Sequence, residues 1–107
     1  MENMASLPHI SVAGAVPTGT HGSGGCNGGL DSAVRAIELV RASGDMNRLA
    51  TDDGDEFRDN VVGLGALGIV TSLELALEPT FQVRQHVFED LLWDVLLSNF
   101  DAVASSG

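Results

Sequence analysis

The stretch GIVTSLELALEP, residues 68–79, carries the clearest secondary-structure signal in this chain. Two sets of side chains alternate along it: Ile69, Thr71, Leu73, Leu75 and Leu77 form one set, and Val70, Ser72, Glu74 and Ala76 form the other. Because successive side chains of a strand point to opposite faces, this pattern predicts a β-strand that Pro79 ends. Alternation resumes in FQVRQHVF, residues 81–88, so we expect a second strand that pairs with the first across the turn at 78–80.

The segments on either side predict an α+β fold. Asp52 or Asp53 can cap a short helix, whose apolar positions are Phe57, Val61 and Leu64. Residues 89–104 predict an amphipathic helix, with an apolar stripe made by Leu92, Leu96, Phe100 and Val103. Residues 31–50 are ambiguous, because their apolar positions have helical spacing while ASGD, at 42–45, can also turn between two strands.

Composition narrows the class of protein. The chain has 107 residues and a net charge of −10, and 44% of it is hydrophobic, which is typical of a globular domain. No basic cluster is present, which argues against binding to nucleic acid or to an anionic membrane. Glycine and polar residues interrupt the apolar run at 61–77, the one cysteine cannot form an intrachain disulfide, and no leader-like segment opens the sequence. We therefore expect a cytoplasmic protein without a membrane segment.

Residues 11–30, SVAGAVPTGTHGSGGCNGGL, are rich in glycine and approach two phosphate-binding motifs without matching either. Thr20 and His21 stand where a Walker loop requires lysine and then serine or threonine, and GSGGCN lacks the third glycine of a dinucleotide-binding fingerprint. The hydroxyls of Ser11, Thr18 and Thr20, with the backbone amides of Gly14, Gly19 and Gly22, would still offer many donors in a short span. The residues alone leave two alternatives open: a cradle for an anion or cofactor, and a tightly packed core loop.

Other patterns of catalytic or metal-binding residues are weaker. The three histidines and Cys26 lack the spacing of metal ligands, so we predict no metal site. Ser23 does not lie in a nucleophile motif, since HGSGG lacks the order that such a motif requires. The acidic run at 52–56 lacks the order of a calcium loop and suits a solvated helix N-terminus.

Three segments together resemble the alditol (xylitol) oxidases: NMASLPHISVAGAVPTGTHGSG at 3–24, LGALGIVTSLELALEP at 64–79 and FQVRQHVF at 81–88. These enzymes belong to the vanillyl-alcohol-oxidase group of flavoproteins, together with the aldonolactone oxidases. The resemblance covers essentially the whole chain. It implies a partial PCMH-type FAD-binding domain at 1–79, namely its second, mainly antiparallel-sheet lobe, and the start of the substrate (cap) domain at 80–107. It also favours two strands, rather than a helix, for the ambiguous segment.

The resemblance implies FAD as cofactor, and oxidation of a polyol hydroxyl with reduction of O2 to hydrogen peroxide. Ser6 matches a catalytic serine at the flavin ring that also touches the substrate hydroxyl. The residues that match the stretch around the FAD diphosphate and ribityl chain are Ser11, Gly14, Ala15, Val16, Pro17 and Thr18, continued by His21 and Gly22. Val70 matches a residue whose backbone meets the adenine end.

The chain also departs from the family pattern. Pro17 stands where relatives usually carry alanine, which removes one backbone N–H. The chain lacks the upstream GSGHS-type segment, whose histidine attaches FAD covalently, and the cap-domain glutamate, arginine and lysine that activate the alcohol.

These departures predict a truncated segment that is inactive alone and needs the missing N- and C-terminal portions of the same enzyme. In the full-length enzyme a polyol or sugar lactone and O2 would be its partners. Two alternatives remain: a segment of an oxidase of D-arabinono- or L-gulono-1,4-lactone, and a non-catalytic binding protein that reuses this half of the fold.

Overall fold

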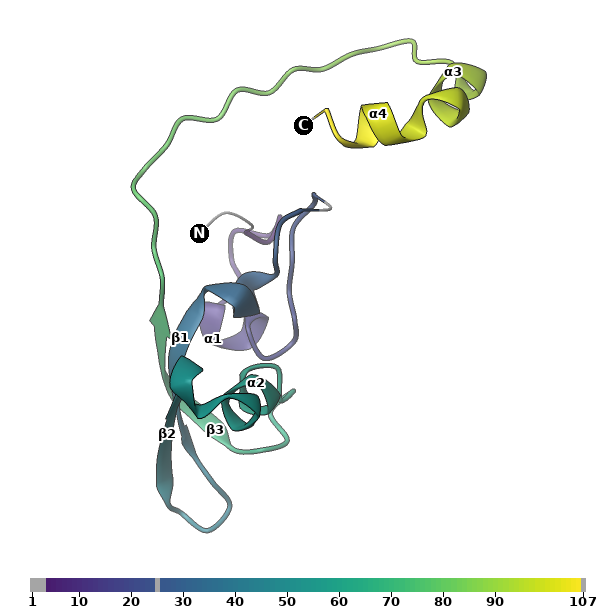
Figure 1. Ribbon diagram of the computed structural model, residues 1–107. Coiled ribbons are helices and arrows are strands. Elements are labelled where there is room, and N and C mark those ends of the chain that lie inside the picture. The colour runs from purple at the N-terminus through teal and green to yellow at the C-terminus, as the bar shows by residue number, and fades with distance from the viewer. Residues whose placement is uncertain (1–3, 25, 107) are drawn as a thin grey trace.

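The computed structural model describes residues 4–24 and 26–106, and its centre is a three-stranded antiparallel sheet (Figure 1). The strands are β1 (Val34–Val40), β2 (Met46–Ala50) and β3 (Ile69–Leu75), in the spatial order β2-β1-β3. β1 and β2 form a hairpin, whose turn is closed by the Arg41 amide donating to the Asp45 carbonyl at 2.9 Å. The two strands expected from the family resemblance are therefore confirmed, and the helical spacing of residues 33–40 is overridden by sheet pairing.

β3 confirms the strand predicted from alternation, but not the predicted faces. Glu38 of β1 is opposite Ser72, whereas the next residue, Leu39, is opposite Val70, so Thr71 is an extra residue in the pairing. Such a bulge reverses the alternation of side chains beyond it. Val70 therefore packs against the core together with Leu73 and Leu75, and Ile69 is left 73% exposed.

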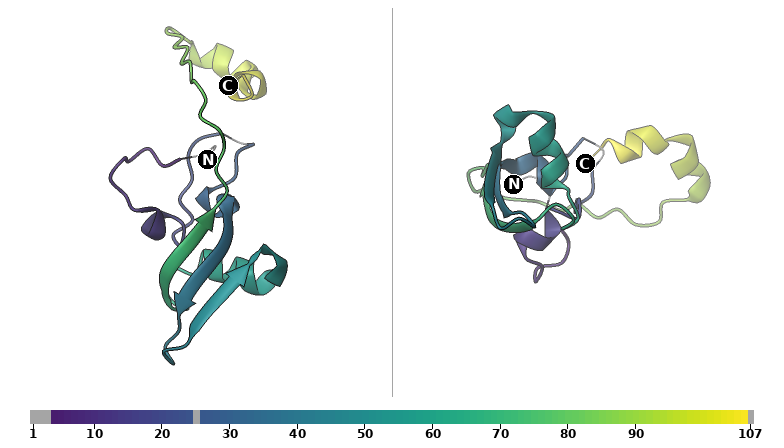
Figure 2. Two further views of the ribbon diagram at one scale, coloured as in Figure 1. Left: turned by 90° about the vertical axis from the view of Figure 1, so that its left-hand side faces the viewer. Right: turned by 90° about the horizontal axis from the view of Figure 1, so that it is seen from below.

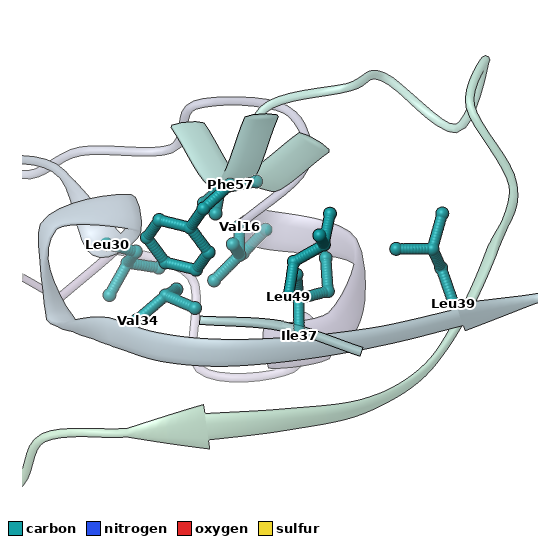
Figure 3. Close-up of a cluster of buried hydrophobic side chains, with 9 residues drawn as sticks. Val16, Leu30, Val34, Ile37, Leu39, Leu49 and Phe57 are labelled. Atoms are coloured by element: carbon teal, nitrogen blue, oxygen red, sulfur yellow. The ribbon is translucent and has the colours of Figure 1, made fainter. Parts of the chain in front are cut away.

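The hydrophobic core lies between the sheet and the helix α2 (Asp55–Val61), as Figure 3 shows. Phe57 and Val61 come from α2, and they pack against residues of the sheet and of the preceding loop: Val16, Leu30, Val34, Ile37, Leu39 and Leu49. The predicted helix is confirmed at Phe57 and Val61, but the predicted cap is wrong: Asp52 and Asp53 lie in the preceding 3-10 turn, and Gly54 is the N-cap. Leu64 lies beyond the end of the helix, with a φ of 52° and an exposed side chain. Two short 3-10 helices, η1 (Leu30–Ala33) and η2 (Thr51–Asp53), precede β1 and α2.

The glycine-rich region contains one turn of helix, α1 (Val12–Ala15). Ser11 caps this turn, since its Oγ accepts a hydrogen bond from the Gly14 amide at 3.1 Å. Val16, directly after α1, is fully buried in the core. The glycine-rich region is therefore anchored to the sheet domain, and is neither a linker nor a wholly irregular loop.

The C-terminal part of the chain leaves the sheet after Ala76, whose amide still donates to the Ala33 carbonyl at 2.8 Å. Residues 76–92 belong to no strand or helix, so the predicted pairing of 81–88 with β3 is wrong (Figures 1 and 2). Pro79 favours extended backbone at the residue before it, and the chain after β3 leads away from the sheet without turning back to pair with it (Figure 1).

The predicted helix at 89–104 is present in two shorter pieces, α3 (Trp93–Ser98) and α4 (Phe100–Ala104). Asn99 separates them with a non-helical backbone, at φ −132° and ψ 25°. The apolar stripe is not buried, since Leu92, Phe100 and Val103 are all exposed and Leu96 is only half-buried. Figure 1 shows this helical pair apart from the sheet, and the described residues extend over 58 Å in their longest direction.

Candidate functional site

An open groove runs beside α1 and has a volume of about 290 Å³; we call it the α1 groove. The residues that line it are Ile10, Ser11, Gly14, Ala15, Thr18 and Thr20. Four of these six belong to the residues that the sequence assigned to FAD: Ser11, Gly14, Ala15 and Thr18. The structure therefore brings part of the predicted cofactor site together on one surface.

The helical turn determines which backbone donors the groove can offer. The Gly14 and Ala15 amides donate to the Ser11 carbonyl at 3.1 and 2.9 Å, and the Val16 amide donates to the Val12 carbonyl at 3.0 Å. These three amides are thus engaged within the turn. Pro17 has no amide hydrogen to continue the series toward the Ala13 carbonyl, so it ends α1.

Hydroxyl groups supply the remaining polar character of the groove. Thr18 Oγ1 donates toward the Gly14 and Ala15 carbonyls, at 3.0 and 3.1 Å, and lies 3.2 Å from Thr20 Oγ1. Ser11 Oγ accepts from the Gly14 amide, which leaves the hydroxyl hydrogen of Ser11 for a ligand. The sequence analysis included Thr20 among the hydrogen-bond donors, but it did not predict that Ile10 lines the groove. The one signal for Ile10 was its position directly before Ser11, the residue that caps α1.

Gly14 lines the groove without a side chain. A Cβ at this position would lie 3.2 Å from Ser11 Oγ, closer than an ordinary van der Waals contact. A ligand can therefore approach the backbone of α1 here, where a larger residue would hold it away.

Two further predicted cofactor residues do not line the groove. Val16 and Pro17 are both buried, and the Pro17 carbonyl accepts a hydrogen bond from the Leu64 amide at 3.1 Å. Their side chains form the packed layer that supports α1 against the sheet.

The other predicted residues lie outside the α1 groove. Ser6 lines a neighbouring pocket of about 210 Å³, which shares Ala15 with the groove. His21 and Gly22 follow the groove, and His21 Nδ1 lies 2.9 Å from the Gly22 carbonyl oxygen. Val70 is on β3 and lines a separate hollow with Val12 and Ala13, on another side of α1.

None of the residues that line the α1 groove is charged. Three arginines form ion pairs elsewhere: Arg41 with Glu56, Arg48 with Glu38 and Glu74, and Arg58 with Asp55. Arg35 donates to the Ser32 and Val34 carbonyls. An anion in this groove would therefore be held by hydroxyl groups, without a neutralising cation.

Two features of the described part of the chain limit its possible chemistry. Residues 4–24 and 26–106 contain no group of three or more histidine, cysteine, aspartate or glutamate side chains that could hold a metal ion. In the same part of the chain, no helix is long and apolar enough to cross a membrane.

No model of a known protein family matches the chain. Alditol oxidase of a Streptomyces species is 53% identical over 107 residues, which are 100% of this chain and 25% of that protein. D-arabinono-1,4-lactone oxidase of Yarrowia lipolytica is 35% identical over 103 residues, or 90% of this chain and 20% of that protein. L-gulono-1,4-lactone dehydrogenase of Mycobacterium tuberculosis is 33% identical over 86 residues, or 80% of this chain and 20% of that protein.

The chain is therefore a relative of the oxidoreductases that act on sugar alcohols and aldonolactones. In particular, it resembles alditol oxidase along its whole length while spanning 25% of that enzyme. The family resemblance inferred from the three motifs is confirmed.

Proposed function

We propose that this chain is one segment of an FAD-dependent oxidase that converts a hydroxyl of a polyol to a carbonyl and reduces O2 to hydrogen peroxide. The observation that carries the proposal is the 53% identity to alditol oxidase over the whole chain. The α1 groove supports it, because four residues assigned to FAD from the sequence line one continuous surface.

The groove has features that fit part of an extended dinucleotide. Gly14 leaves room at the backbone, the Ser11 hydroxyl can donate, and Ile10 offers an apolar wall. Ser11, Gly14 and Thr18 would hold the diphosphate and ribityl region, while Val16 and Pro17 form the packed support behind them. When bound, the flavin supplies the electron acceptor for oxidation of the alcohol.

Ser6 and Val70 would meet the two ends of the cofactor. The Ser6 pocket adjoins the groove through Ala15, which supports a position for Ser6 beside the flavin ring and the substrate hydroxyl. The Val70 backbone would meet the adenine end, and His21 and Gly22 would continue the wall between them.

The domain assignment belongs to the same proposal. Residues 1–79 would form part of the second lobe of a PCMH-type FAD-binding domain, and 80–107 would begin the substrate domain. The departure of the chain from the sheet after Ala76 and the separate helical pair α3–α4 support a boundary in this region. The cytoplasmic location stays a prediction.

An aldonolactone is the second candidate substrate. It is favoured by the 35% identity to D-arabinono-1,4-lactone oxidase over 90% of the chain. Alditols are preferred here because the alditol oxidase matches at higher identity and over the full chain.

The proposal is tested by determining the coding sequence on both sides of this segment and expressing the complete reading frame. We expect a purified flavoprotein that produces peroxide with xylitol or sorbitol. Peroxide with aldonolactones alone would support the second candidate. A complete reading frame with these boundaries, whose product binds no flavin, would contradict both and favour a non-catalytic binding protein.

A further inference from the structure

Asn60, near the end of α2, is a polar residue buried beside the hydrophobic core, and it is only 9% exposed. Its Nδ2 donates a hydrogen bond to the Glu56 carbonyl, one turn earlier in the same helix, at 2.8 Å. Its Oδ1 is also buried, but it accepts no hydrogen bond from the described part of the chain. Because a buried amide oxygen without a donor is destabilising, Asn60 needs a partner that this part of the chain does not supply.

The bond to Glu56 fixes the orientation of the Asn60 amide. Turning the amide over would exchange Nδ2 and Oδ1, and it would place Oδ1 against the Glu56 carbonyl oxygen, where two acceptors repel each other. The group that lacks a partner is therefore the carbonyl end of the side chain, which is an acceptor. Its partner must be a hydrogen-bond donor.

Asn60 also lines a small cavity, of about 10 Å³, in which it supplies the one polar side chain. The lining combines apolar side chains of β1 and β3 with three glycines, Gly63, Gly65 and Gly68, which can contribute only backbone atoms. Every residue of the lining lies between positions 17 and 70, so the cavity is formed entirely by the sheet domain.

The size of the cavity and the chemistry of its lining fit one water molecule. Internal sites that hold a single water begin at about 10–15 Å³, and the water needs two to four polar partners. Asn60 Oδ1 is one such partner. The amides of Gly63 and Gly65 donate no backbone hydrogen bond within the described part of the chain, so the loop at 62–68 can supply others.

We propose that Asn60 Oδ1 is the acceptor of a binding site for a single internal water, which joins α2 to the loop at 62–68. The Leu64 amide of that loop donates to the Pro17 carbonyl at 3.1 Å, and Pro17 belongs to the packed layer that supports α1. The water thus stabilises the loop on which this layer rests. The site goes beyond the proposed function, because it needs neither flavin nor substrate.

The test compares the unmodified chain with two matched variants, Asn60→Leu and Asp59→Leu. Leucine has the same number and branching of side-chain heavy atoms as either residue, but no polar atom. Asp59 is the adjacent residue of α2, is exposed and does not line the cavity. In high-resolution crystal structures we expect a water within about 3.2 Å of Asn60 Oδ1 in the unmodified chain and in Asp59→Leu, and no water in Asn60→Leu.

Hydrogen exchange of the Leu64 amide measures the effect of the water on the loop. We expect this amide to exchange about fivefold faster or more in Asn60→Leu, and at an unchanged rate in Asp59→Leu. A cavity without water in the unmodified chain, or a loop amide bonded directly to Asn60 Oδ1, would overturn the proposal. So would equal acceleration by the two variants. If Asn60→Leu does not fold, the structure of the unmodified chain still decides the question.

Discussion

At the scale of single residues, Gly68 controls how β3 enters the sheet. Its φ is 155°, and a Cβ there would lie 2.6 Å from the Val40 carbonyl oxygen. Gly65 also has a positive φ, 75°, but a Cβ at that position would meet nothing within 4 Å. A substitution at Gly65 therefore tests backbone strain alone, whereas one at Gly68 tests strain together with steric overlap.

We expect Gly68→Ala to lower the free energy of unfolding by about 3 kcal/mol, since it adds overlap with β1 to the strain. Gly65→Ala should cost only about 1 kcal/mol, because it adds strain alone. Urea unfolding of the two variants measures the difference. Equal losses would show that the close approach to Val40 has no energetic weight.

Gly14 and Ala13 make a matched pair for the cofactor site, because both are exposed residues of α1 that face different hollows. Gly14→Val fills the α1 groove, whereas Ala13→Val leaves that groove unchanged. In a complete oxidase that carries this segment, we expect Gly14→Val to weaken flavin binding roughly tenfold or more, and Ala13→Val to preserve it. Flavin content and thermal unfolding should be measured together. If a folded Gly14→Val protein retains flavin, the cofactor does not bind in the α1 groove.

At the scale of elements, α2 covers the core through one face and exposes the other. Phe57 is 7% exposed within the core, while the neighbouring Arg58 forms a solvent-exposed ion pair with Asp55 at 2.9 Å. We expect Phe57→Ala to cost about 3–4 kcal/mol of unfolding free energy, and Arg58→Ala less than about 0.5 kcal/mol. Denaturant titrations of both variants check this. Similar costs would mean that α2 is not held by its apolar face.

The elements also show how far the sequence determines the fold. Alternation predicted β3, and helical spacing predicted α2, because both patterns match the period of the structure that forms. The acidic cap expected for α2 was wrong, since Gly54 stands at its N-cap. Alternation could not reveal the bulge at Thr71, which depends on the register against β1 and places Val70 on the core face. Alternation also predicted a strand at 81–88 that does not form, because a strand needs a neighbouring strand to pair with as well as an alternating pattern.

The candidate site was accessible to the sequence mainly through resemblance. Local reasoning found donors around Gly14 but left a core loop as an equal alternative. In the structure Val16 is buried in the core, while Gly14 lines the open α1 groove. The Gly14 and Ala15 amides donate to the Ser11 carbonyl because residues 12–15 form a helical turn. The sequence did not predict this turn, because a glycine-rich run has no helical periodicity.

At the scale of the whole molecule, this chain carries one wall of the proposed cofactor site. No charged group lines the α1 groove, so the groove itself contains no strong base to activate an alcohol. We therefore expect the isolated chain, with FAD added, to produce no peroxide from xylitol or sorbitol. A coupled peroxidase assay against a protein-free blank measures this, and peroxide above the blank would contradict the account.

The most direct test of the central claim is a segment exchange. The matching quarter of the Streptomyces alditol oxidase, 25% of its length, is replaced by this chain, and flavin content and peroxide production with xylitol are measured. The account predicts a folded enzyme that binds flavin and oxidises xylitol, and that loses flavin when Gly14→Val is introduced. A folded hybrid that never binds flavin would show that this segment no longer forms part of an FAD site.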